Sequence, residues 1–127
     1  MNQERYKRGY DQLTKVNGEG AERMVAGMGE LESDFATYLV EFAYGDIYGR
    51  PGLDLKSRQI AAVASLTTLG CAGPQLKIHV QGALNVGCTR TEIIEVIMQT
   101  AIYAGFPAAT NGLRAAREVF KEHDQPK

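Results

Sequence analysis

The sequence predicts an all-α protein of about six helices. Apolar residues recur at helical spacing along most of the 127 residues, and no segment shows the convincing apolar–polar alternation of a half-buried strand. Glycines and prolines separate these periodic segments, as they do where helices end or begin. A chain of this length is most simply one domain over residues 1–127, with a core from about residue 6 to about residue 121.

The N-terminal part predicts two helices and a connection between them. The first helix runs from Gln3 to Val16, and the run Asn17-Gly-Glu-Gly20 ends it because glycine adopts left-handed backbone angles at little cost. A glycine-punctuated connection is expected from Ala21 to Gly29. The second helix is expected from Glu30 to Tyr44 or slightly beyond, with apolar residues at helical spacing.

Gly49-Arg50-Pro51-Gly52 must break this helix, because proline restricts the residue before it. Asp54 is a candidate N-cap for a third helix from about Leu55 to Leu69. Pro74 fits the first turn of a fourth helix, which Gly87 ends.

Two further helices are expected in the C-terminal part. Thr89 and Glu92 match a capping box, in which each side chain accepts a hydrogen bond from the other residue's backbone N–H. The fifth helix then continues to Tyr103 or Ala104 and stops at Gly105. Pro107 opens a last helix that ends near Lys121.

Composition excludes several classes of function. The net charge of −1 gives no basic face for nucleic acid, and no apolar run is long enough to cross a bilayer. The polar N-terminus lacks the apolar segment of a signal peptide, so we expect a soluble, cytoplasmic protein. Cys71 and Cys88 form neither a disulfide framework nor a metal-binding spacing, so we expect both to be reduced and partly buried.

Assembly is expected from the distribution of apolar residues. The third, fifth and sixth helices carry apolar side chains on more than one side. A chain this short cannot hide several such helices within itself. We therefore expect a homo-oligomer.

Among residues that can do chemistry, His79 and Arg50 come first. The ordinary pKa of histidine suits proton transfer near neutral pH, and Gln75 lies one turn before His79 on the fourth helix. The alternative is a histidine that merely packs. Arg50 lies in an interhelical loop, where its guanidinium can bind a carboxylate through two hydrogen bonds. The alternative is an exposed arginine, or one paired with Asp46 or Asp54.

Other candidates are weaker. Arg58 is a second possible anion contact or a surface ion pair. Tyr44, Tyr48 and Tyr103 can donate hydroxyl hydrogens to a pocket, although buried tyrosines usually belong to the core. No set of His, Asp and Glu indicates a metal.

These segments together resemble the carboxymuconolactone decarboxylase family from about Tyr6 to Phe120. The resemblance rests on six motifs in register: Tyr44-Gly-Asp-Ile-Tyr48, Arg50-Pro-Gly-Leu53, Lys56-Ser-Arg58, Leu76-Lys-Ile-His79, Gly87-Cys-Thr-Arg-Thr-Glu-Ile-Ile-Glu95 and Tyr103-Ala-Gly-Phe-Pro-Ala-Ala109.

The resemblance implies an all-helical, alkylhydroperoxidase-D-like fold that assembles as a trimer or hexamer. It implies a carbon–carbon lyase of aromatic-compound catabolism that removes carbon dioxide from 4-carboxymuconolactone or a similar small substrate without a cofactor. Arg50 would bind the substrate anion, His79 would be the general acid, and Gln75 with a tyrosine would orient them. Tyr44, Tyr48, Tyr103 and Arg58 would be substrate-binding residues.

The sequence also departs from the family pattern. Gln75 stands where glutamate is common, Tyr44 and Tyr48 where tryptophans are common, and Phe42 where a histidine often occurs. These departures leave two alternatives open. One is the peroxiredoxin-type activity of the superfamily, although its Cys-x-x-Cys positions are Ala72 and Gln75 here. The other is a non-catalytic, ligand-binding oligomer.

Overall fold

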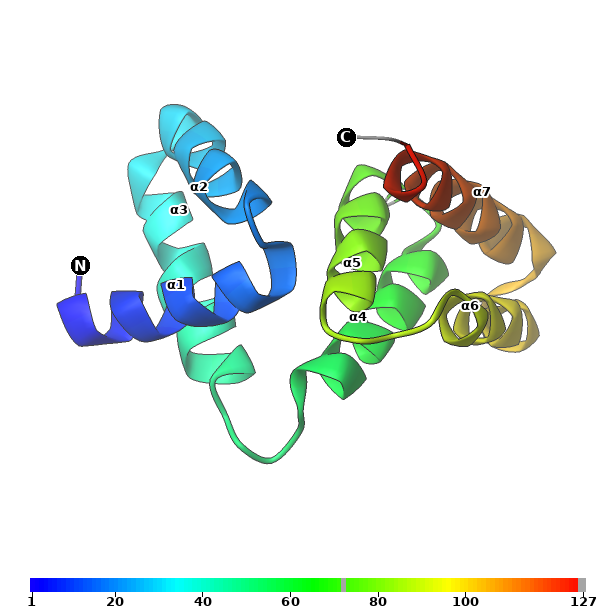
Figure 1. Ribbon diagram of the computed structural model, residues 1–127, viewed down its shortest axis with the longest axis horizontal. Helices are drawn as coiled ribbons and strands as arrows, with labels where there is room; N and C mark the ends of the chain where they lie inside the picture. The colour runs from blue at the N-terminus through cyan, green and yellow to red at the C-terminus, as the bar shows by residue number, and fades with distance from the viewer. Residues whose placement is uncertain (72, 126–127) are drawn as a thin grey trace. The chain divides into compact units, whose positions relative to one another are not determined.

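The computed structural model describes residues 1–71 and 73–125. The chain divides into two compact units, Met1–Leu55 and Lys56–Lys127. The described residues form seven α-helices and one π-helix and no strand, so the predicted all-α class is confirmed (Figure 1). A single domain over the whole chain stays a prediction.

The first unit contains α1 (Gln3–Asn17), α2 (Gly20–Leu31), α3 (Ser33–Tyr38) and the π-helix η1 (Leu39–Tyr48). The first predicted helix is confirmed, and Gly18 after it has a φ of 57°. The predicted connection from Ala21 to Gly29 is wrong, because this segment is helical. Gly27 and Gly29 weaken a helix but do not break it, and the residues around them favour one.

Close contact between α1 and η1 holds the first unit together. A Cβ atom on Gly9 would lie 1.8 Å from the carbonyl oxygen of Val40, so only glycine permits this approach. Around the contact, Leu13, Val16 and Val40 are fully buried. The contact fixes η1, and with it the loop that follows η1.

Charged groups join the same two helices. Arg5 contacts Asp46 through Nε and Nη2 at 3.0 and 2.5 Å, and Arg8 contacts it at 3.2 Å. The buried carboxylate of Glu41 accepts a hydrogen bond of 2.7 Å from the backbone N–H of Asn2. This side of η1 faces α1, whereas the aromatic residues Phe35 and Tyr38 of α3 and Phe42 of η1 are left exposed.

The second unit consists of α4 (Leu55–Leu69), α5 (Gly73–Asn85), α6 (Arg90–Ala104) and α7 (Phe106–His123). These bounds confirm the last four predicted helices, except that α7 ends two residues later than Lys121. Their core is an apolar cluster that includes Val63, Leu76, Val80, Ile93, Ile97, Ala116 and Val119. It packs one face of each helix against the others.

Local signals set the ends of these helices. Thr89 and Glu92 form the predicted capping box at the start of α6, with hydrogen bonds of 2.8 and 3.0 Å. Gly105 separates α6 from α7 with a φ of 94°, a backbone conformation that side chains rarely allow. Residues 49–54 form the predicted break between η1 and α4.

The two cysteines differ in their surroundings. Cys88 is buried in the core of the second unit, whereas Cys71 is exposed after α4, and both are free thiols. The expectation that Cys71 is partly buried is therefore wrong, because the apolar face of α4 ends before it. Ala72, one of the two positions of the superfamily's dithiol motif, lies outside the described residues.

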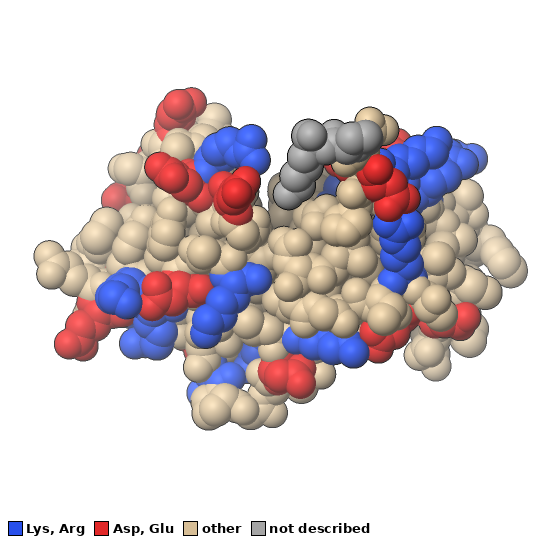
Figure 2. Space-filling view, viewed as in Figure 1, with Lys and Arg blue, Asp and Glu red and all other residues tan. Residues whose placement is uncertain are grey.

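The surface carries charges of both signs. On the face shown in Figure 2, acidic and basic side chains are interspersed on each unit. None of the helices described here is long and apolar enough to span a membrane.

Candidate functional site

His79 lies in the middle of α5, half-buried against α4. Its Nδ1 atom is 3.1 Å from Nε2 and 3.4 Å from Oε1 of the Gln59 side-chain amide. The same Nε2 donates a hydrogen bond of 3.2 Å to the main-chain oxygen of His79. Burial lowers the pKa of His79, because the charged imidazolium loses water around it. The neutral imidazole is therefore favoured near neutral pH.

Gln59 is the partner that sequence reasoning missed. Its side chain is fully buried, on the same stripe of α4 as Val63 and Thr67, which is the stripe that faces the core. Burying an amide costs free energy unless the amide is hydrogen-bonded. His79 supplies two partners for it, the main-chain oxygen and the ring nitrogen Nδ1. A polar residue at this i, i+4 spacing with core residues is the signal that indicates such a role.

The second unit holds three other candidates, Gln75, Arg58 and Tyr103. Gln75, in the first turns of α5, is exposed, and no hydrogen bond joins it to His79. Arg58 is half-buried and precedes Gln59 directly, so it projects from a different side of α4. Tyr103, near the end of α6, is 79% exposed.

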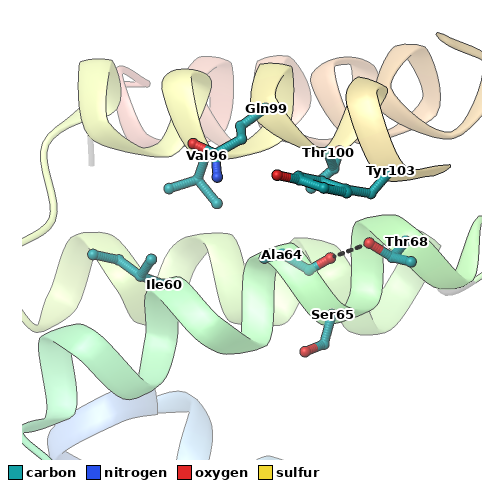
Figure 3. Close-up of a pocket in the computed structure, with 8 residues that line it drawn as sticks. All are labelled: Ile60, Ala64, Ser65, Thr68, Val96, Gln99, Thr100 and Tyr103. Atoms are coloured by element: carbon teal, nitrogen blue, oxygen red, sulfur yellow. Dashed lines mark hydrogen bonds between the residues drawn. The ribbon is translucent and has the colours of Figure 1, made fainter. Parts of the chain in front are cut away.

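A hollow of about 680 Å³ lies between α4 and α6. Figure 3 shows Ile60 of α4 and Val96 of α6 on its facing sides, with the ring of Tyr103 along one end. Its lining carries no charged side chain and does not include His79: Ile60, Ala64, Ser65, Thr68, Val96, Gln99, Thr100 and Tyr103. Such a lining suits neutral or apolar groups.

Arg50, Tyr44 and Tyr48 belong to the first unit. The rings of Tyr44 and Tyr48 are 4.7 Å apart at 42° on η1. Tyr44 is buried, and burial raises the pKa of its hydroxyl. Arg50 is exposed in the loop after η1, where its backbone N–H donates to the carbonyl of Ile47 at 3.2 Å. The local setting of Arg50 is thus fixed by the end of the π-helix.

The side chains of His79 and Arg50 are suited to proton transfer and to anion binding, respectively. A half-buried neutral imidazole can accept a proton, the imidazolium that then forms can donate one, and an exposed guanidinium can bind a carboxylate. Among the described residues, no three His, Cys, Asp or Glu side chains group as a metal site.

Comparison with known proteins identifies relatives along almost the whole chain. A 4-carboxymuconolactone decarboxylase of Acinetobacter baylyi is 36% identical over 124 residues, which cover 96% of this chain and 92% of the relative. A nitrosuccinic acid decarboxylase of Metarhizium robertsii is 34% identical over 89 residues, covering 66% of this chain and 58% of that protein. An uncharacterized 15.0 kDa protein of Paracoccus denitrificans is 36% identical over 88 residues, covering 68% of this chain and 66% of that protein.

The family model points the same way. The model of the carboxymuconolactone decarboxylase family matches residues 33–118, from α3 into α7. This match includes η1, the loop with Arg50, the buried Gln59 and His79. The chain therefore belongs to the carboxymuconolactone decarboxylase family.

Proposed function

We propose that this protein is a cofactor-independent decarboxylase that acts on 4-carboxymuconolactone or a similar small lactone carboxylate. The observation that carries the proposal is the similarity to a 4-carboxymuconolactone decarboxylase over 96% of the chain. The half-buried His79 supports it, because burial lowers the pKa of the imidazole and so makes the protonated ring a stronger acid.

The reaction needs little from the protein besides binding and charge stabilisation. When carbon dioxide leaves the lactone, the electron pair of the broken bond delocalises into the unsaturated lactone carbonyl and forms a dienolate. The substrate is then its own electron sink. Nitrosuccinic acid has a comparable sink in its nitro group, so one scaffold can serve both chemistries. The protein must hold the anion, stabilise the growing negative charge and deliver one proton to carbon.

Each candidate residue has a role in this scheme. Arg50 binds a substrate carboxylate or the lactone oxygen, and His79, in its protonated imidazolium form, is the general acid that protonates the dienolate. Gln75 is a further residue that orients the reacting groups. Tyr44, Tyr48, Tyr103 and Arg58 bind the rest of the substrate. The scheme requires Arg50 and His79 to serve one site in the working protein.

Assembly into a trimer or hexamer is part of the proposal. On α6, the residues Ile94, Met98 and Ile102 are 36%, 52% and 76% exposed, on a different side of the helix from the buried Ile93 and Ile97. Burying this apolar stripe between copies would remove it from water. Multi-angle light scattering of the purified protein tests this, and a monomer at micromolar concentration would contradict it.

Turnover measurements test the function itself. The purified protein is mixed separately with 4-carboxymuconolactone, nitrosuccinic acid and an organic hydroperoxide, and release of carbon dioxide or loss of peroxide is followed. The proposal predicts carbon dioxide from the lactone, with no metal or cofactor added. If carbon dioxide is released only from nitrosuccinic acid, that acid and not the lactone is the substrate. If the protein only consumes peroxide, and does so with a thiol, the redox activity is supported instead.

A further inference from the structure

We infer that Gln59 holds neutral His79 in the tautomer that carries its proton on Nε2. The imidazole then presents an N–H donor, rather than a lone pair, at the edge away from Gln59. This tautomer is a property of the free protein. Its use in catalysis rests on the proposed function, which it deepens by assigning a positioning residue.

The main chain fixes the orientation of the Gln59 amide. The carbonyl oxygen of His79 can only accept a hydrogen bond, so the amide atom 3.2 Å from it must be the NH₂ group of Gln59. Turning the amide over would place two oxygens against each other at this contact. Gln59 is fully buried, so water offers its amide no alternative partner.

This orientation decides what faces the imidazole. The NH₂ group lies 3.1 Å from Nδ1, a normal hydrogen-bond length, whereas the amide oxygen lies at 3.4 Å, where such a bond is weak. Nδ1 of His79 must therefore accept, and a neutral ring that accepts at Nδ1 carries its proton on Nε2. Within the described part of this unit, Nε2 has no hydrogen-bond partner of its own.

Two lysines near this pair, Lys77 of α5 and Lys56 of α4, are themselves paired with carboxylates. On α5, Lys77 pairs with Glu118 and Glu122 of α7. At the start of α4, Lys56 pairs with Glu92 of α6 at 3.1 Å. Each of these charges is satisfied by an opposite one, and burial is the cause of the lowered pKa of His79. The ring is thus kept neutral by desolvation and oriented by an amide.

The tautomer determines what the neutral ring of His79 can do, whereas protonating the dienolate is a separate step that requires the imidazolium. An Nε2–H group donates a hydrogen bond to an oxygen on which negative charge builds, as a preorganised donor does in an oxyanion site. The same atom cannot accept a proton. A carboxylate at position 59 would do the opposite, because it would accept from Nδ1–H, free the Nε2 lone pair and raise the pKa of His79. Glutamine therefore selects the donor form.

Nitrogen-15 NMR of the ligand-free protein tests this assignment. With ¹⁵N-labelled histidine, two-bond ¹H–¹⁵N correlations identify the protonated ring nitrogen of each imidazole. We expect His79 in one form, Nε2–H, while the exposed His123 gives the averaged mixture of a solvated ring. Gln59→Glu should shift His79 to Nδ1–H and raise its pKa, whereas the matched control Gln75→Glu should leave the tautomer unchanged.

The outcomes separate this inference from the proposed function. Nδ1–H as the main form of wild-type His79, or no change of tautomer and pKa in Gln59→Glu, would overturn it. Should Gln59→Glu not fold, Gln59→Met serves in its place, and His79 should then approach the mixture that His123 shows. None of these spectra requires a substrate, so a protein that turns over no lactone can still confirm the tautomer.

Discussion

Replacing Gly9 with alanine should open the contact between α1 and η1. The added Cβ would lie 1.8 Å from the carbonyl oxygen of Val40, 2.8 Å from its carbonyl carbon and 3.0 Å from the backbone nitrogen of Gly45. Ordinary contact begins at 3.4 Å, so the main chain of η1 must retreat by about 1.6 Å. Both neighbours are backbone within a helix, and neither can yield by changing a rotamer.

The cost follows from what the displacement uncovers. Overpacking a core with one extra carbon typically costs about 1–3 kcal/mol. Here the helices must separate around the fully buried Leu13, Val16 and Val40, so we expect at least about 3 kcal/mol. With a urea m-value of about 2 kcal/mol per molar, the unfolding midpoint should fall by about 1.5 M. Far-UV circular dichroism at fixed protein concentration measures this midpoint.

Gly27→Ala is the matched control. Gly27 lies exposed within α2, and a Cβ there would meet nothing within 4 Å. The same chemical change should therefore stabilise this helix by up to about 1 kcal/mol, because alanine has the higher helix propensity. Equal midpoints for Gly9→Ala and the wild type would refute the close contact that fixes η1 and the loop with Arg50.

Three further predictions concern stability. Gly112→Ala should cost about 1–2 kcal/mol by urea unfolding, less than Gly9→Ala, because its Cβ would meet the side-chain methyl of Thr67 at 2.8 Å. Because Arg5 lowers the pKa of Asp46, stability should decline as the pH falls from about 3.8 toward that lower pKa, and Asp46→Asn should lack this part of the acid-unfolding slope. Burial lowers the pKa of His79 in the folded protein, so just below pH 6.5 the unfolded state binds more protons than the folded state. The free energy of unfolding should therefore rise with pH in this range. Urea midpoints of His79→Gln should lack this rise.

Helices with strong local signals could be predicted from the sequence. The capping box at Thr89 and Glu92, and the positive-φ glycine at 105, fixed both ends of α6. The helical segment from Gly20 to Leu31 was missed because its glycines weaken a local signal that packing overrides. The sequence also did not indicate which side of η1 faces α1. That side is set by the close approach of Gly9 to Val40, whereas the aromatic residues Phe35, Tyr38 and Phe42 stay exposed.

Some residues of the candidate site could be predicted from the sequence, and others could not. His79 and Arg50 stand out as residue types suited to acid–base and anion chemistry, and motifs in the sequence mark both. Gln59 does not stand out, because its role depends on α4 and α5 packing with a buried amide opposite an imidazole. Sequence reasoning offered one orienting amide, Gln75, one turn away on the same helix, and did not consider Gln59. A partner on another helix is visible only once the helices are assembled.

Steady-state kinetics of His79→Ala and Arg50→Ala with 4-carboxymuconolactone test whether the imidazole and the guanidinium take part in the reaction. We expect His79→Ala to lower kcat by about 100-fold or more, the range of general-acid effects. Arg50→Ala should act mainly through a higher KM, because it removes anion binding. Circular dichroism and light scattering should match the wild type for both variants. Full turnover by His79→Ala would show that the imidazole takes no part in the reaction and would contradict the proposed role of His79 as general acid.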